Sequence, residues 1–128
     1  MYNILICDDE KDIVSALSIY LSTENYNIFT AYTGQEALDI VAKHDIHLIL
    51  MDIMMPIKNG YEAAKMIRAL DRDDAKTVPI IAMTANAFTE DILKSKESGM
   101  NEHIAKPIDA KLLVKVISEF VENKEEDS

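Results

Sequence analysis

Two patterns of apolar residues follow each other along this chain, and the pair of patterns repeats five times. Short apolar runs without internal alternation, as at residues 47–52, are typical of strands covered on both faces. Between them, apolar residues recur at three- and four-residue spacing, as at Val14, Leu17 and Leu21, which favours amphipathic helices. The pattern predicts strands at residues 2–7, 25–32, 47–52, 78–84 and 102–105. It predicts helices at residues 10–24, 33–44, 61–70, 88–98 and 109–123, with a polar connection at 71–77.

Capping and turn residues support several of these boundaries. Thr33 with Glu36 three residues later is typical of a helix start, and Gly99 suits a helix end. Five strand–helix units predict an α/β fold with a parallel, doubly wound sheet and helices on both faces. We expect one domain at residues 1–122 and a solvated acidic tail at 123–128.

Composition narrows the function classes. The 128 residues are 48% hydrophobic and 28% charged, as in ordinary globular domains, and no apolar stretch reaches membrane-spanning length. A net charge of −10 argues against direct binding to nucleic acid. The single cysteine, Cys7, lies in an apolar run and allows no internal disulfide. We therefore expect a cytoplasmic protein with no membrane insertion, in which Cys7 fills the core.

Chemically useful residues follow four of the five predicted strands. Asp8 and Asp9 follow the first, Asp52 ends the third, Thr84 ends the fourth and Lys106 follows the fifth. Because parallel strands end at the same edge of a sheet, these side chains should meet there. Each has an ordinary explanation when taken alone, such as a helix cap or a surface charge. Their arrival at one edge is much harder to explain by coincidence.

Together these side chains suit phosphoryl chemistry. Three carboxylates repel one another unless something positive lies between them, and Mg²⁺ prefers oxygen ligands. A metal-bound aspartate can attack phosphorus, while a lysine and a hydroxyl neutralise and bind the transferred group. No GxxxxGK[ST] loop is present to bind a nucleotide. The set therefore favours acceptance of a phosphoryl group onto an aspartate.

The chain resembles the receiver domain of two-component response regulators, a flavodoxin-like (βα)5 fold with strand order 2-1-3-4-5. The residues that carry this resemblance are ILICDDE at 4–10, MDIMMP at 51–56 with Asn59-Gly60, IIAMTA at 80–85 and AKP at 105–107. They span nearly the whole chain. The stretches at residues 83–87 and 99–108 are especially similar to receivers of hybrid histidine kinases, which feed phosphorelays.

The resemblance implies roles for the acids. Asp52 would accept a phosphoryl group from a phosphohistidine on a histidine kinase or a histidine phosphotransfer protein. Asp9 would bind Mg²⁺ directly and Asp8 mainly through water. The backbone carbonyl of Met54 would be a further ligand. The domain would then be a signalling switch rather than an enzyme, catalysing only its own phosphorylation and dephosphorylation.

The resemblance also implies a switch mechanism. Thr84 and Lys106 would bind the phosphoryl group, and the bond from Lys106 to Pro107 would be cis. Movement of Thr84 would alter the surface formed by the last two helices and the last strand, from about Phe88 to Phe120. That surface would carry the output and would also suit a homodimer.

One position departs from the family pattern. His103 stands three residues before Lys106, where the family usually carries Tyr or Phe. The imidazole could rotate as that aromatic ring does, and add sensitivity to pH, or it could be an ordinary surface histidine. The switch role of His103 is therefore open. Since residues 1–128 include no output domain, we expect a single-domain regulator or a module of a longer protein.

Other functions share parts of this pattern. A docking module with the same fold but no phosphorylation would explain the atypical His103. A flavin-binding electron carrier would need a loop rich in Ser, Thr and Gly after the first strand, where Asp8 and Asp9 stand instead. A phosphatase of the haloacid dehalogenase type places an acid two residues after its nucleophile, where this chain has Met54.

Overall fold

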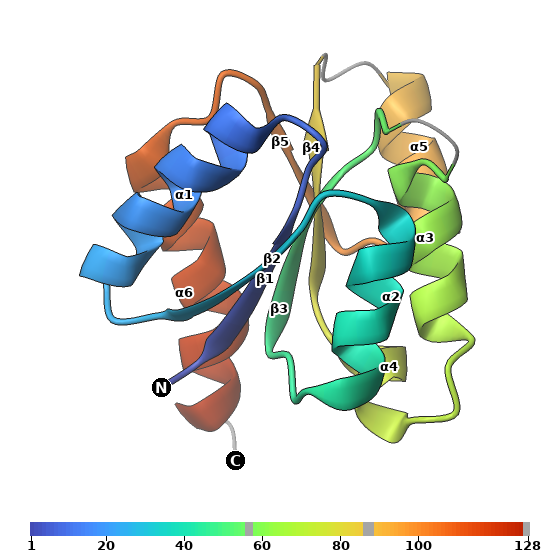
Figure 1. Cartoon of the computed structure of the whole chain (residues 1–128), viewed down its shortest axis with the longest axis horizontal. Coiled ribbons are helices and arrows are strands. Elements are labelled where there is room, and N and C mark those ends of the chain that lie inside the picture. Colours follow the sequence, from blue (N-terminus) through green and yellow to red (C-terminus); the bar gives the residue numbers. More distant parts are fainter. Residues whose placement is uncertain (56–57, 86–88, 127–128) are drawn as a thin grey trace.

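A five-stranded parallel sheet forms the centre of the computed structural model, which describes residues 1–55, 58–85 and 89–126 (Figure 1). The strand order is β2-β1-β3-β4-β5, and each neighbouring pair is parallel. The strands are β1 (Asn3–Cys7), β2 (Asn27–Ala31), β3 (Leu48–Asp52), β4 (Ile80–Thr84) and β5 (Glu102–Ala105). The predicted flavodoxin-like order is confirmed.

The helices form one layer on each face of this sheet (Figure 1). One layer consists of α1 (Lys11–Thr23) and α6 (Ala110–Glu126). The other consists of α2 (Gly34–Lys43), α3 (Gly60–Arg68), α4 (Asp73–Thr77) and α5 (Thr89–Glu97). The sheet is therefore covered on both faces, as the unbroken apolar runs predicted.

The core consists of two apolar clusters, one on each side of the sheet. Side chains alternate between the two faces along a strand, so Leu5 belongs to the cluster beneath α2 and α3, while Ile4 and Ile6 belong to the cluster beneath α1 and α6. Every residue of β3 and β4 is buried. The ends of these strands are thus anchored from both sides and present their last side chains from a rigid base.

Helix starts follow the chemistry of their capping residues. The hydroxyl of Thr33 accepts a hydrogen bond from the backbone N–H of Glu36 at 3.1 Å, which confirms the predicted cap of α2. Asn59 and Glu62 form a complete capping box at the start of α3, a cap that the sequence analysis did not predict. Gly99 has a φ of +95°, the left-handed conformation expected of a residue that ends a helix.

Helix α4 lies within the segment predicted to be a polar connection, so that prediction is wrong. Its five residues carry no apolar periodicity, which is why the sequence pattern missed it. The side chain of Arg72 stabilises its start by pairing with Asp74 at 2.7 Å, and it also pairs with Asp45 at 2.9 Å. The same guanidinium donates to the carbonyl of Val41 at the end of α2. The pairing with Asp74 is local, whereas the contacts with Asp45 and Val41 join the start of α4 to residues distant in sequence.

The C-terminal helix is longer than predicted. Helix α6 continues to Glu126, whereas the sequence predicted a helix end at residue 123 and a solvated acidic tail at 123–128. Glu and Lys are strong helix formers, which explains the extension into this polar segment. The domain boundary at residue 122 stays a prediction. Pro56 and Phe88, named in the sequence motifs and the output surface, lie outside the described residues.

The connection between β5 and α6 contains the Lys106–Pro107 peptide bond, which is cis, the isomer that the family resemblance implied. Among the described helices, none is both long and apolar enough to cross a membrane.

Gly60 is required by a close approach of backbone to backbone. A methyl group at this position would overlap the carbonyl oxygen of Asp52 and lie 2.8 Å from the Cα of Ile53. The amide of Gly60 donates to the carbonyl of Ile53 at 3.3 Å. The first residue of α3 is therefore packed directly against the end of β3, which gives a steric reason for the glycine in the sequence motif Asn59-Gly60.

Gly60→Ala should destabilise the protein by about 2 kcal/mol, because the strand end or the helix must shift to admit the methyl group. Gly34→Ala is the matched control, since Gly34 is likewise the first residue of a helix, but its new methyl would lie 3.0 Å from the Lys58 side chain and 3.2 Å from the Lys58 carbonyl oxygen, which are looser contacts than those at Gly60. We expect that control to change stability by less than about 1 kcal/mol. Urea denaturation measures both, and equal effects would contradict the steric explanation.

Candidate functional site

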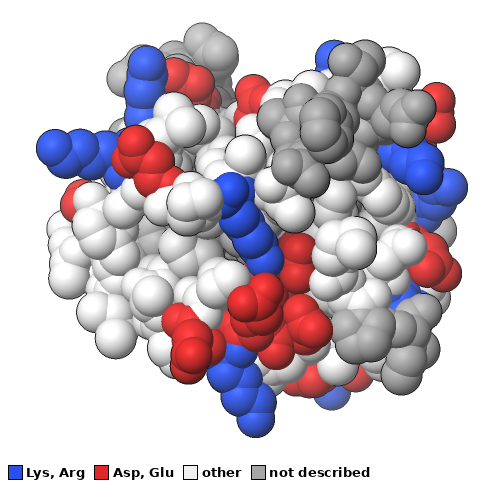
Figure 2. Space-filling view, turned by 90° about the horizontal axis from the view of Figure 1, so that it is seen from above, with Lys and Arg blue, Asp and Glu red and all other residues white. Residues whose placement is uncertain are grey.

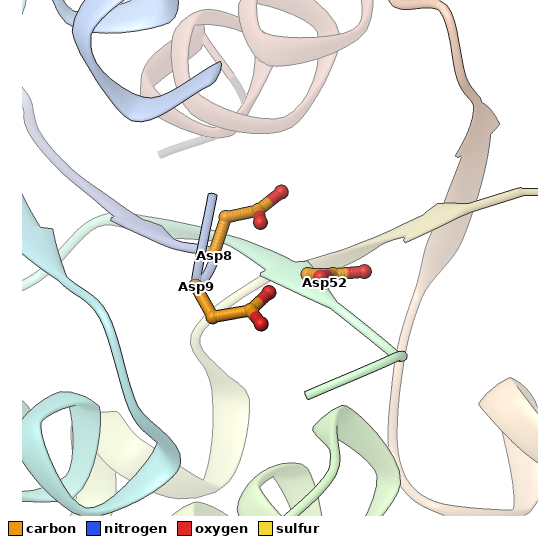
Figure 3. Close-up of side chains that lie close together, drawn as sticks. All are labelled: Asp8, Asp9 and Asp52. Carbon is orange, nitrogen blue, oxygen red and sulfur yellow. The ribbon is translucent and has the colours of Figure 1, made fainter. Parts of the chain in front are cut away.

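Three carboxylates meet where β1 and β3 end (Figure 3). Asp8 and Asp9 follow β1, and Asp52 is the last residue of the adjacent β3. One oxygen from each of the three lies within 4.8 Å of the others. Seen from above, acidic side chains gather near the middle of this face, with a basic side chain against them (Figure 2). The predicted convergence of the acids is therefore present in the structure.

Burial makes this cluster electrostatically unfavourable. Asp8 and Asp52 are 0% and 3% exposed, whereas Asp9 faces solvent. Loss of solvation, together with the negative charge of Asp8, raises the pKa of Asp52 from its ordinary value of 3.8 to about 6. A hydrogen bond from the backbone N–H of Met54 to Asp52 Oδ1, at 3.1 Å, acts in the opposite direction.

The donor set fits a hard divalent cation. Carboxylate oxygens are the ligands that Mg²⁺ prefers, and a dication would relieve the repulsion that the three acids create. Two buried acids supply fixed oxygens, and the exposed Asp9 leaves room on the solvent side for water ligands. The residues present therefore suit Mg²⁺, as the sequence predicted.

Lys106 provides a positive charge inside the acidic cluster. Its ammonium nitrogen lies 2.9 Å from Asp8 Oδ2 and 3.6 Å from Asp52 Oδ1, and it is also 3.6 Å from Glu10 Oε1. Burial lowers the pKa of Lys106, but the hydrogen bond to Asp8 and the nearby negative charges outweigh it, so the pKa is raised overall. Lys106 therefore stays charged at neutral pH.

Thr84 is the last residue of β4, the strand next to β3, which ends in Asp52. Thr84 is 1% exposed, and its hydroxyl oxygen has no hydrogen-bond partner among the described residues. The backbone carbonyl of Thr84 accepts a hydrogen bond from the N–H of Lys106 at 2.7 Å, which fixes the two residues side by side. A buried hydroxyl without a partner is costly, so this one is available for an oxygen-rich ligand.

Other predicted residues lie at the margin of this cluster. The side chain of Met54 is exposed, and its N–H is committed to Asp52, while the ligand role of its carbonyl stays a prediction. His103 lies on β5, with its Nδ1 3.5 Å from Glu102 Oε1, so it is not part of the acidic cluster. It lines a pocket of about 190 Å³ together with Ile92, Ser95, Lys96, Met100, Asn101 and Glu102.

Glu10 is a site residue to which the sequence assigned no role. Its carboxylate lies 3.6 Å from Lys106, and its backbone N–H donates to Asp8 Oδ1 at 2.9 Å. The only signal was its place as the third acid in the run from Asp8. Cys7 is buried, as predicted, and loss of solvation raises the pKa of its thiol to about 12, so it is no nucleophile.

Comparison with known proteins agrees with this geometry. A family model of the response regulator receiver domain matches residues 4–118. The curated response regulator ArlR of Staphylococcus aureus is 37% identical over 114 residues, which cover 89% of this chain and 50% of ArlR. This chain therefore spans about half the length of the curated relatives it matches.

Solved receiver domains have the same fold. The receiver domain of the sensor histidine kinase PA1611 from Pseudomonas aeruginosa, solved with magnesium in its active site cleft, has a TM-score of 0.85 and 29% identity over 94% of this chain and 97% of that one. The receiver domain of Ssk1 from Saccharomyces cerevisiae, solved with the histidine phosphotransfer protein Ypd1, has a TM-score of 0.87 and 33% identity over 94% and 88%.

Replacing the central acid should stabilise the metal-free protein. Because the folded-state pKa of Asp52 is raised to about 6, the folded state binds more protons than the unfolded state between about pH 4 and 6, and stability falls as pH rises through that window. In chelator at pH 7.5, Asp52→Asn should gain about 1–2 kcal/mol of unfolding free energy. This value is less than the full pKa shift implies, because solvent at the open side of the site screens the charges.

The gain of Asp52→Asn should shrink as pH falls toward 4. Urea denaturation across this range measures it. Asp71→Asn is the control, since Asp71 is an exposed acid in the connection between α3 and α4 and not at the strand ends that carry the cluster, and its effect on stability should be small. We expect wild type to lose stability relative to Asp52→Asn as pH rises. The opposite trend, a relative gain for wild type, would contradict the raised pKa of Asp52.

The unpartnered hydroxyl of Thr84 leads to a second prediction. Thr84→Val should raise the free energy of unfolding of the metal-free protein by about 1 kcal/mol, because it removes a buried polar atom that has no partner in the part of the chain that the structure describes. Thr33→Val should lower it by about 1 kcal/mol, because that hydroxyl caps α2. Thermal and urea denaturation measure both, and a loss of stability in Thr84→Val would show that the hydroxyl is satisfied.

Proposed function

The chain belongs to the response regulator receiver domain family, and we propose from this premise that Asp52 accepts a phosphoryl group from a phosphohistidine on a partner protein. The observation that carries the proposal is the meeting of a buried carboxylate, an ammonium and an unpartnered hydroxyl at the ends of neighbouring strands. These groups belong to Asp52, Lys106 and Thr84. No simpler structural role accounts for all three.

The proposed transfer is a displacement at phosphorus. A carboxylate oxygen of Asp52 forms the new P–O bond while the P–N bond to histidine breaks, and the released imidazole nitrogen keeps the bonding electrons and takes up a proton. Met54 N–H holds Oδ1 of Asp52, which orients the carboxylate. The ammonium of Lys106 offsets the negative charge, and the Thr84 hydroxyl would donate to a phosphoryl oxygen.

Mg²⁺ belongs to this proposal. Asp8, Asp9 and Asp52, with the carbonyl of Met54, would hold it. When bound, it supplies positive charge that neutralises these acids and the transferred group. The magnesium found in the PA1611 receiver supports this choice of cation.

Phosphorylation would shift an equilibrium between two conformations of the output surface. A bond from the Thr84 hydroxyl to the phosphoryl group would draw the end of β4 toward Asp52. The affected surface consists of α5, β5 and α6, and it includes His103 and the pocket that His103 lines. The switch role of His103 and a homodimer through this surface belong to the same proposal.

The phosphodonor would be a histidine kinase or a histidine phosphotransfer protein, acting in the cytoplasm as part of a phosphorelay. The Ssk1 receiver bound to Ypd1 supports this class of partner. The domain would catalyse only its own phosphorylation and dephosphorylation. A docking module that never carries phosphate is the weaker explanation, because it would need neither the buried Thr84 hydroxyl, which has no partner among the described residues, nor the pairing of Lys106 with Asp52.

Incubation with a small phosphodonor such as phosphoramidate tests the proposal directly. Wild type should gain one phosphoryl group in the presence of Mg²⁺ and almost none in chelator, as measured by intact-mass spectrometry. Asp52→Asn should lose labelling by at least about 100-fold, since it removes the nucleophile. Asp71→Asn, an exposed acid, should be labelled like wild type.

The bond formed should be an acyl phosphate, and hydroxylamine should release it. Equal labelling of wild type and Asp52→Asn would overturn the assignment of the acceptor. Absence of any labelling with Mg²⁺, by small donors and by a histidine phosphotransfer protein alike, would favour the docking module.

A further inference from the structure

Lys106 is shared by three carboxylates, and one of them stands outside the proposed metal set. The ammonium nitrogen is hydrogen-bonded to Asp8 at 2.9 Å and lies 3.6 Å from both Asp52 and Glu10. Asp8 and Asp52 belong to the group of acids that suits a dication, whereas Glu10 does not. The lysine side chain is 19% exposed and that of Glu10 is 63% exposed, so Glu10 approaches from the solvent side.

This arrangement sets up a competition for the same oxygens. A dication among Asp8, Asp9 and Asp52 and the ammonium of Lys106 repel each other, and both are attracted to Asp8 and Asp52. When the dication is present, the hold of Asp8 and Asp52 on Lys106 must weaken. Among the described carboxylates that pair with Lys106, Glu10 is the one outside the group of acids that would bind the metal.

The backbone places Glu10 for this role. The N–H of Glu10 donates to Asp8 Oδ1 at 2.9 Å, so the carboxylate that bonds Lys106 through one oxygen positions Glu10 through the other. Glu10 is also the N-cap residue of α1 and makes no side-chain cap bond to that helix. Its carboxylate is therefore not used by the helix and remains directed to the ammonium.

We propose that Glu10 is a positioning residue for Lys106, which holds the ammonium at the solvent rim and so lowers its competition with a divalent cation for Asp8 and Asp52. The inference rests on the proposed function in one respect, the use of these acids as magnesium ligands. It predicts that Glu10 promotes metal binding through Lys106 as well as through its own charge.

A double-mutant cycle on Mg²⁺ affinity, measured by isothermal titration calorimetry without any phosphodonor, tests this role. Glu10→Gln should weaken Mg²⁺ binding by about threefold more in the Lys106 protein than in the Lys106→Gln background, the range expected for a part-exposed ion pair. Asp12→Asn is the matched control, because Asp12 is an exposed acid two residues further along the same helix. Its effect should be the same in both backgrounds.

A spectroscopic readout follows Lys106 itself. In metal-free protein, the NMR signal of the Lys106 ammonium should shift in Glu10→Gln and stay in place in Asp12→Asn, and Glu10→Asp should restore part of the wild-type position. A Glu10→Gln effect on Mg²⁺ affinity that is equal in both backgrounds would overturn the inference while leaving the metal site intact. Failure of wild type to bind Mg²⁺ would overturn the inference together with the proposed metal site.

Discussion

The repulsion among three carboxylates held at one edge of the sheet is the constraint on which the rest of this structure depends. Asp8 and Asp52 are almost fully buried, and their oxygens lie close to those of Asp9. The free energy cost is visible in the pKa of Asp52, which burial and the charge of Asp8 raise to about 6. A chain optimised only for stability would not place these acids together, so the arrangement marks a functional site.

The apolar scaffold makes this arrangement possible. Strands β1, β3 and β4 are buried by helices on both faces, so the ends of these strands cannot move apart to relieve the repulsion. At Gly60, the start of α3 packs directly against the backbone of Asp52 at the end of β3. The hydrophobic core thus supplies the rigidity, and the loops at the strand ends supply the chemistry.

Two further groups at this edge respond to the same constraint. Lys106 is drawn into contact with Asp8, Asp52 and Glu10 and partly balances their charge. Thr84 keeps a buried hydroxyl that has no partner among the described residues, although an apolar side chain would cost less free energy there. Both features make sense when the site is completed by a dication and a phosphoryl group. The metal-free site therefore has surplus negative charge and an unused donor, which together favour binding of those groups.

The sequence by itself predicted the alternation of five strands with helices along the chain and the cap at Thr33. It also predicted that Asp8, Asp52, Thr84 and Lys106 meet at one edge of the sheet. They depend on local periodicity and on the rule that parallel strands end together. Helix α4 could not be predicted, because its start depends on the pairing of Arg72 with residues near the end of α2. The steric need for Gly60, the raised pKa of Asp52 and the sharing of Lys106 with Glu10 were likewise decided by tertiary structure. Each is set by distances and burial in the folded chain, and a linear pattern of residue types does not contain these quantities.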